Sequence, residues 1–161
     1  MGLTTVEKER IAKNVIEVFL ELFRREVTAV TIENPMTHFP EEVVIKKYAS
    51  RYNDIMLESK DNYPVLIVNK PNLSHEQLTF RNTNTIGYIP IEIHCTNSLA
   101  TDKFYDQINN IIDTHRDDLE TAGITNLILD NDDNDTYTRG GFKDHWAQAT
   151  WKFEFDFVNG D

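Results

Sequence analysis

The sequence predicts an α+β protein: a mixed, mostly antiparallel sheet of about four to six strands, with a long N-terminal helix and a second helix packed on one face. Two observations predict this class. Apolar residues recur at helical three- and four-residue steps in two segments, and short β-branched or aromatic runs with alternating polarity fill the rest. The length of 161 residues suits one domain, residues 1–161.

The first element is an amphipathic helix that we expect over Thr5–Glu26. Its apolar face is formed by residues spaced at helical steps, namely Val6, Ile11, Val15, Val18, Phe19, Leu22 and Phe23. The opposite face mixes acidic and basic residues. Because this polar face is mixed in sign, we expect the apolar stripe to pack on the sheet and not on a membrane surface.

Five short runs then read as strands: Val27–Ile32, Glu42–Tyr48, Val65–Val68, Leu78–Arg81 and Ile86–Cys95. The last two are expected to form a hairpin across the polar Asn82–Thr85. Between the second and third runs, the ambiguous stretch Ala49–Asn62 is expected to form a loop or a single helical turn. Pro90 cannot donate a ladder hydrogen bond, which predicts a sheet edge or a bulge there.

Alternation divides the Ile86–Cys95 strand into two faces. Apolar residues share one face, namely Ile89, Ile91, Ile93 and Cys95, and the other carries Pro90, Glu92 and His94. We therefore expect Cys95 to be a buried thiol and His94 an ordinary histidine at a sheet edge.

The second helix is expected to begin with Ser98 as its N-cap and to stop at Gly123, a residue that favours a left-handed cap. A strand, Ile124–Leu129, follows. The run Asp130–Asp135 is expected to be a solvated loop, and Arg139-Gly140-Gly141 a flexible joint. The final strand places its aromatic residues on one face, namely Trp151, Phe153, Phe155 and Phe157.

Composition excludes several classes of protein. There are 16 Lys+Arg and 27 Asp+Glu residues, for a net charge of −11, which disfavours a groove for nucleic-acid phosphates. The single cysteine, Cys95, excludes an intrachain disulfide framework and a cysteine-rich zinc site. No apolar run approaches the roughly 20 residues that cross a bilayer. The first residues lack the apolar core of a signal peptide, so we expect the protein to remain where it is made.

Motifs for chemistry are not found, and we expect no catalytic residue, no cofactor and no metal site. An EF-hand loop starting at Asp130 needs Gly at its sixth position and Glu at its twelfth, where this chain has Asp135 and Gly141. A looser carboxylate cage around an ion stays open at this acidic run. Phosphate-binding loops, a nucleophile elbow and a Cys–His pair do not occur at the required spacings.

The order of elements nevertheless resembles a known family. After the N-terminal helix come a "YPVLIV" strand, the continuous stretch "IPIEIHCTNSLATDKFYDQINNIIDTHRDDLETAGI", an acidic run and the closing strand "HWAQATWKFEFDFV". This layout resembles the tail terminator, or tail-completion, family of minor tail and neck proteins in long-tailed viruses. The resemblance runs from about Thr5 to Val158 and lies in the layout, since no invariant motif anchors it. The segment Pro35–Tyr48 departs from it by being longer and less regular.

The resemblance implies a structural virion protein, made in the host cytoplasm and located in the tail or neck of the virion. It would assemble as a homo-hexameric ring on the tail tube protein, stop tube polymerisation and contact the head-completion proteins of the neck. DNA would pass through the ring without sequence-specific binding, and no membrane would be involved. The alternatives are a head–tail joining or other tail-assembly protein of similar fold, a non-viral α+β binding module, and an enzyme.

Rings are heterologous assemblies, so one surface must fit a different surface of the next copy. We hypothesise that the exposed helix face around Arg24 and Arg25, the only adjacent arginine pair, or the aromatic last strand supplies one of these surfaces. We further hypothesise that the acidic segment reaches a tube or neck partner. Its candidate contact residues are Asp132, Asp133, Asp135 and Arg139.

Overall fold

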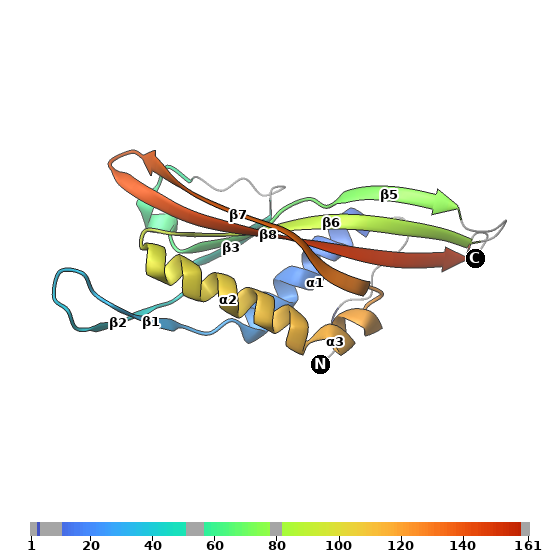
Figure 1. Ribbon diagram of the computed structural model, residues 1–161, viewed down its shortest axis with the longest axis horizontal. Helices are drawn as coiled ribbons and strands as arrows, with labels where there is room; N and C mark the ends of the chain where they lie inside the picture. The colour runs from blue at the N-terminus through green and yellow to red at the C-terminus, as the bar shows by residue number, and fades with distance from the viewer. Residues whose placement is uncertain (1–2, 4–10, 51–56, 78–81, 159–161) are drawn as a thin grey trace.

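The computed structural model describes residues 3, 11–50, 57–77 and 82–158, and it confirms the predicted α+β class. The elements in chain order are α1 (Ile11–Glu26), β1 (Val30–Glu33), β2 (Pro40–Val43), β3 (Lys47–Ser50), η2 (Lys60–Asn62), β4 (Val65–Val68), β5 (Asn72–Gln77), β6 (Asn82–Cys95), α2 (Ser98–Thr114), α3 (Arg116–Thr121), β7 (Thr125–Arg139) and β8 (Phe142–Val158). The β1–β2 hairpin projects from one end of the molecule, beyond the larger sheet (Figure 1).

The larger sheet has six strands in the order β3-β4-β6-β8-β7, with β5 also paired to β6. Only β3 and β4 run parallel. Strand β6 is central: it pairs with β8 along its whole length, and on its other side it pairs first with β5 and then with β4. The second arm of the predicted hairpin is part of β6, but the predicted turn at Asn82–Thr85 is wrong: these residues begin β6 and pair with β5, Asn72–Gln77, and with β8. Residues 78–81, which were predicted as its first arm, lie outside the described residues.

Pro90 lies in this central strand, so the expectation of an edge or a bulge is wrong. Its neighbour in β8 is Thr150. On the other side, β5 ends its pairing at Tyr88 and β4 begins at Ile91, so Pro90 falls where β6 changes partner. There the Pro90 carbonyl accepts a hydrogen bond of 2.9 Å from the Asn69 backbone N–H. A proline is tolerated at this position because neither β5 nor β4 is paired with Pro90, so no hydrogen bond from a backbone N–H is needed there.

The main core lies between the sheet and the two long helices. It takes the predicted apolar face of β6 and the described part of the predicted α1 stripe, including Phe19 and Phe23, whose side chains are fully buried. From β8 it takes Trp151, Phe153 and Phe155, so the aromatic face of the last strand is core. That placement rules out these three residues as a docking surface. The side chain of Phe157 lies outside the described residues.

The helices keep their predicted positions with shifted ends. α1 is described from Ile11, and the predicted start near Thr5 lies outside the described residues. The N-cap of α2 is Asn97, not Ser98: its side chain accepts a hydrogen bond of 3.1 Å from the Ala100 N–H. The predicted second helix is interrupted at His115, which separates α2 from α3. Gly123 has φ 105°, as a left-handed stop requires.

Three short strands differ in extent from the prediction. β1 begins at Val30, and the predicted strand over Glu42–Tyr48 is divided into the end of β2 and the start of β3, with residues 44–46 between them. β1 and β2 form their own two-stranded sheet. β4 has the predicted bounds. The described part of the ambiguous segment Ala49–Asn62 contains the end of β3, a turn and the short helix η2.

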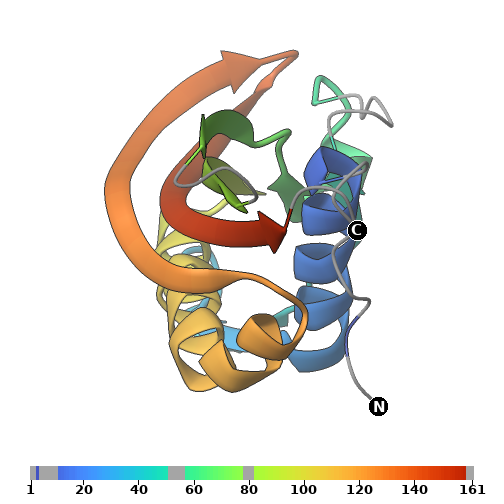
Figure 2. The same ribbon diagram turned by 90° about the vertical axis from the view of Figure 1, so that its right-hand side faces the viewer.

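The acidic run is a strand and not a loop. β7 continues through Asp130–Asp135 to Arg139 and pairs with β8, and Gly140-Gly141 form the turn between them. Together the two strands make a long, strongly bent hairpin that wraps around one side of the molecule (Figure 2). A register shift occurs between Leu129 and Asn131. The acidic residues adopt strand geometry because β8, whose aromatic face is fixed in the core, supplies a paired neighbour.

Candidate functional site

A cluster of charged side chains is buried on the sheet face opposite the main core. Glu92 and His94 project from β6 onto this face, and Asp144 joins them from β8. The exposed fractions are 6% for Glu92, 2% for His94 and 0% for Asp144. The expectation that His94 is an ordinary edge histidine is therefore wrong, because β4 and β8 flank its strand on both sides.

Both ring nitrogens of His94 face carboxylates. Nδ1 lies 2.9 Å from Asp144 Oδ2, and Nε2 lies 3.2 Å from Glu92 Oε1. A neutral imidazole has one N–H and can donate to only one of these oxygens, whereas the imidazolium donates to both. With both carboxylates ionised, the geometry fits a protonated His94 bridging β6 and β8.

Three further side chains complete the cluster. Arg139 Nε donates to Asp144 Oδ2 at 2.8 Å, and the Asn69 side-chain amide donates to Glu92 Oε2. The Tyr63 hydroxyl lies 2.7 Å from the Leu57 carbonyl and 3.0 Å from Asp144 Oδ2. The cluster thus ties β6, β7 and β8 to the segment that leads into β4.

The pKa values respond to this arrangement. Burial by itself lowers the pKa of His94, but the hydrogen bonds and negative charges of Asp144 and Glu92 outweigh it, so the pKa is raised above its usual value. Burial raises the pKa of Asp144, and the hydrogen bonds from His94 and Arg139 more than reverse this, so its pKa is lowered. Burial, reinforced by Asp144, raises the pKa of Tyr63. The arrangement therefore favours the charged forms of His94 and Asp144 and the neutral form of Tyr63.

The cluster is built to hold strands together. A general base needs a ring nitrogen free to take a proton from a substrate or nucleophile. Both nitrogens of His94 are engaged by carboxylates inside the protein, and the ring is almost fully buried. Breaking such a buried arrangement by removing one charged partner destabilises a protein strongly. We therefore assign the cluster a structural role in fixing the β7–β8 hairpin.

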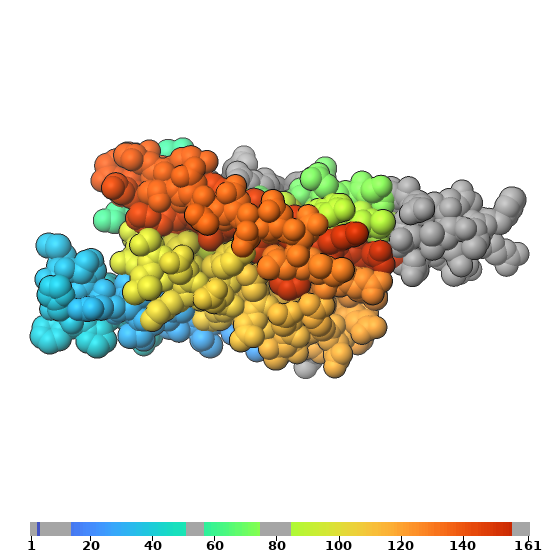
Figure 3. Space-filling view, in the orientation of Figure 1, coloured from blue at the N-terminus to red at the C-terminus, as the bar shows by residue number. Residues whose placement is uncertain are grey.

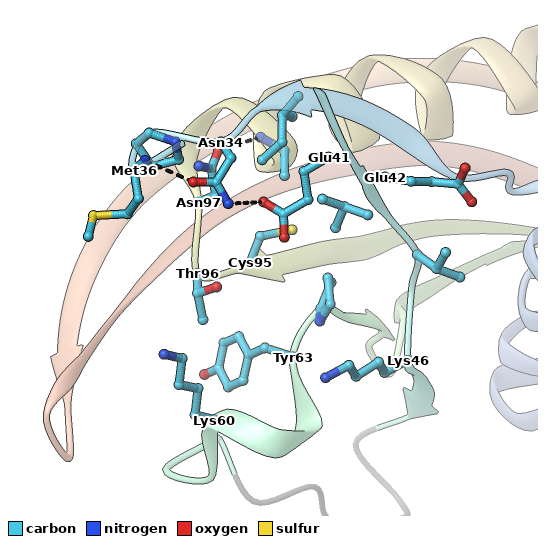
Figure 4. A pocket seen from close by; sticks show the side chains of 16 residues that line it. Asn34, Met36, Glu41, Glu42, Lys46, Lys60, Tyr63, Cys95, Thr96 and Asn97 are labelled. Atoms are coloured by element: carbon cyan, nitrogen blue, oxygen red, sulfur yellow. Dashed lines mark hydrogen bonds between the residues drawn. The ribbon is translucent and has the colours of Figure 1, made fainter. Parts of the chain in front are cut away.

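A pocket of about 620 Å³ adjoins the cluster at Tyr63. It lies between the β1–β2 hairpin on one side and the η2–β4 connection on the other, with the β6–α2 junction at its base (Figure 4). Lys46 and Lys60 lie on the Tyr63 side, across from Asn34 and Glu41. Both lysines are exposed, and neither has an ion-pair partner among the described residues. The Tyr63 wall of the pocket is therefore basic.

The thiol of Cys95 lies at the base of this pocket and is only 1% exposed, as predicted for a buried thiol. Burial raises its pKa to about 12. Because a thiolate is the reactive form of cysteine, this thiol is inert at neutral pH.

The candidate contact residues fall into three groups. Arg24 lies 6.0 Å from the Tyr48 ring, and Arg25 pairs with Glu26 at 3.0 Å and with Asp118 at 3.1 Å, so both arginines contact their own chain. Arg139 belongs to the buried cluster and also lies over the Tyr137 ring at 5.3 Å.

Asp132, Asp133 and Asp135 are exposed on β7. In an extended strand, Asp132 points to the opposite face from Asp133 and Asp135. On its face, Asp132 Oδ2 lies 3.4 Å from the Tyr105 hydroxyl. This alternation spreads the carboxylates of the run, and no group of three or more His, Cys, Asp and Glu side chains within the described residues is placed to hold a metal ion.

Sequence reasoning missed the cluster and the pocket. The sequence did show that Glu92 and His94 share one face of a strand. If that strand is central in the sheet, the two side chains are buried together and need polar partners. Asp144 and Arg139 could not be attached to them, because that pairing depends on the register between β6, β7 and β8.

Comparison with known proteins adds no family. No protein-family model matches the chain, and no curated protein matches it significantly. Among the described residues, no helix is both long and apolar enough to span a membrane.

Proposed function

We propose that this chain is a tail terminator protein of a long-tailed virus, with a structural and not a catalytic role. In this proposal it forms a homo-hexameric ring on the tail tube, stops tube growth and contacts the head-completion proteins of the neck. It would be made in the host cytoplasm and reside in the virion. The observation that carries the docking role is the apolar tip of the β1–β2 hairpin.

That tip exposes two large apolar side chains, Met36 at 87% and Phe39 at 73%. Exposed apolar groups gathered on a projection are typical of surfaces that bind another protein. The projecting hairpin is visible at one end of the space-filling view (Figure 3).

The tip is also ordered by its own hydrogen bonds. The Asn34 side chain accepts from the backbone N–H groups of Met36 and Thr37 at 2.8 and 3.1 Å, and it donates to Glu41 at 3.0 Å. His38, with φ 61°, lies 3.1 Å from Glu33. A turn held in this way presents Met36 and Phe39 with little further loss of entropy on binding.

Charge supports the passage of DNA through a ring. The chain has a net charge of −11. A lumen of like charge does not grip DNA phosphates, so DNA can slide through it. The absence of a free nitrogen on the buried His94 supports the structural role over a catalytic one.

Electron microscopy of the purified protein tests the proposal. We expect closed rings with a central channel, and mass photometry should give the mass of a hexamer. A protein that stays monomeric at every concentration, also in the presence of the tube protein encoded by the same virus, would overturn the proposal.

One observation favours a second candidate, a non-viral binding module: the pocket of about 620 Å³ is within the size range of small-molecule sites. In that case the protein would remain monomeric, and a small molecule would raise its melting temperature. If the protein forms a ring and small molecules leave its melting temperature unchanged, the tail terminator is favoured over the binding module.

A further inference from the structure

Apart from Leu129, the exposed large apolar side chains of the described residues lie on two separate surfaces. The first is formed by the β1–β2 hairpin, the pocket beside it and the first turn of α2, and it carries Met36, Phe39, Val44 and Leu99. We call it the pocket surface. The second is the face of β7 that carries Ile128 and Tyr137; Leu129, which is paired with the core residue Trp151, lies on the other face of the strand. We call it the β7 surface.

The two surfaces differ in charge. On the pocket surface, Lys46 and Lys60 form a basic wall, and the acidic Glu41 and Glu42 lie on the β2 side, where Glu41 accepts a hydrogen bond of 3.0 Å from Asn34. On the β7 surface, Asp133 and Asp135 share one strand face with Tyr137. Each surface therefore combines large apolar side chains with a patch of charge, and the basic wall of one is opposite in sign to the β7 carboxylates.

The carboxylates of the β7 surface are available to a partner. Asp133 and Asp135 are exposed, and the bonds that they make, of 2.8 and 2.7 Å, go to the backbone N–H groups of the residues that follow them. β7 is also the last strand of its sheet, so within the described residues its outer edge has no neighbouring strand. The space-filling view shows β7 lying open across the face of the molecule, apart from the hairpin (Figure 3).

We propose that the β7 surface of one copy docks on the pocket surface of the next copy, with Asp133 and Asp135 against Lys46 and Lys60. The apolar side chains of β7 then cover Met36 and Phe39. Since the two surfaces are different and lie on different parts of one chain, the contact is heterologous, which is the kind of contact that builds rings when the rotation between copies closes. The inference rests on the proposed ring function and names the surfaces that make the ring.

A charge-swap experiment tests this contact, with assembly followed by mass photometry across a concentration series. The variant K46E/K60E makes both surfaces acidic, and the variant D133K/D135K makes both basic. Each variant alone should need at least about tenfold more protein to assemble, because like charges then face each other. All four residues are exposed, so both variants should keep the wild-type circular dichroism spectrum and melting temperature.

Mixing the two variants is the decisive step. Every contact in the mixture can pair an acidic surface with a basic one if the copies alternate, so assembly should return toward the wild-type concentration. The matched control is K47E/K70E, which makes the same change in net charge at two exposed lysines that do not line the pocket. This control should assemble like the wild type.

The outcomes separate the inference from the proposed function. If the wild type forms rings and neither charge variant weakens them, or if mixing fails to restore assembly, the proposed contact is wrong while the ring stands. If the wild type never assembles, both are wrong. Weakening by each variant alone, with recovery in the mixture and an unaffected control, establishes the contact.

Discussion

Replacing His94 by glutamine probes the buried charge cluster most directly. Glutamine has one side-chain amide that can donate to one carboxylate, so Glu92 and Asp144 can no longer both be bridged. Removing one partner of a buried charged pair costs about 3–5 kcal/mol. Because Arg139 still pairs with Asp144 and Asn69 with Glu92, we expect the lower end, about 3 kcal/mol.

The assay is reversible unfolding, followed by tryptophan fluorescence and circular dichroism. For a chain of this size, each kcal/mol moves the melting temperature by about 2–4 °C, so H94Q should melt about 6–12 °C lower than the wild type. Trp146 is a local reporter, because its ring lies 6.3 Å from that of His94. The matched control is H38Q: His38 also pairs with a glutamate, but its side chain is 76% exposed, so this change should cost at most about 1 kcal/mol.

The pH dependence gives an independent reading. The pKa of His94 is raised on folding, so its contribution is complete below the unfolded value of about 6.5 and is lost as pH rises through the folded value. The pKa of Asp144 is lowered, so its contribution is complete above about 3.9 and is lost as pH falls through the folded value. The stability difference between wild type and H94Q should therefore be largest between about pH 4 and 6.5 and should shrink in alkali. Equal stability of the two proteins throughout this range would refute the account of the cluster.

Three further changes have defined outcomes. G87A should lower stability by about 1–3 kcal/mol in urea unfolding, because a Cβ there would lie 2.1 Å from the buried ring of Phe153; unchanged stability would mean that the ring can move. N97A should lower stability by about 0.5–2 kcal/mol through loss of the α2 cap, and N97S should restore most of it. R24E/R25E should weaken ring assembly if this arginine pair forms part of an interface, while the loss of its exposed ion pairs should lower monomer stability by no more than about 1 kcal/mol; rings that form at the wild-type concentration would remove the pair from the interface.

The fold class was predictable because the residues that form the core recur with a helical or strand period within single stretches of sequence. The stripe of α1 containing Phe19 and Phe23, the alternating isoleucines of β6 and the aromatic face of β8 are each visible in one stretch of sequence. The α1 stripe and the β6 isoleucines were assigned to buried faces, whereas the aromatic face of β8 was expected in the core or at an interface; the structure buries the described residues of all three together. The bounds of β4 were predictable as well, because Pro64 and Pro71, which interrupt regular structure, lie on either side of it.

The acidic strand could not be predicted from its own residues. Asp and Asn are depleted in strands, so Asp130–Asp135 reads as a loop. Its pairing with β8, which aligns Asp135 with Trp146, overrides this preference. Charged residues on an exposed edge strand also hinder unwanted pairing with other strands, so a sequence that looks unsuited to a sheet is suited to the edge of one.

The buried cluster was out of reach for a different reason. His94 and Asp144 are separated by 50 positions, and their contact depends on a register that no local pattern specifies. The same holds for Arg139, which was expected at a partner surface and instead contacts Asp144 through the turn between β7 and β8. Contacts between polar residues far apart in the sequence can be predicted only once the strand order and register are known.

The central claim, that the chain terminates a tail tube, is tested most directly by measuring tube growth. The tube protein of the same virus would be polymerised with and without this chain, and tube lengths and ends recorded by cryo-electron microscopy. We expect tube growth to stop and a ring of density to close one end of each tube. Tubes of unchanged length with bare ends would contradict it.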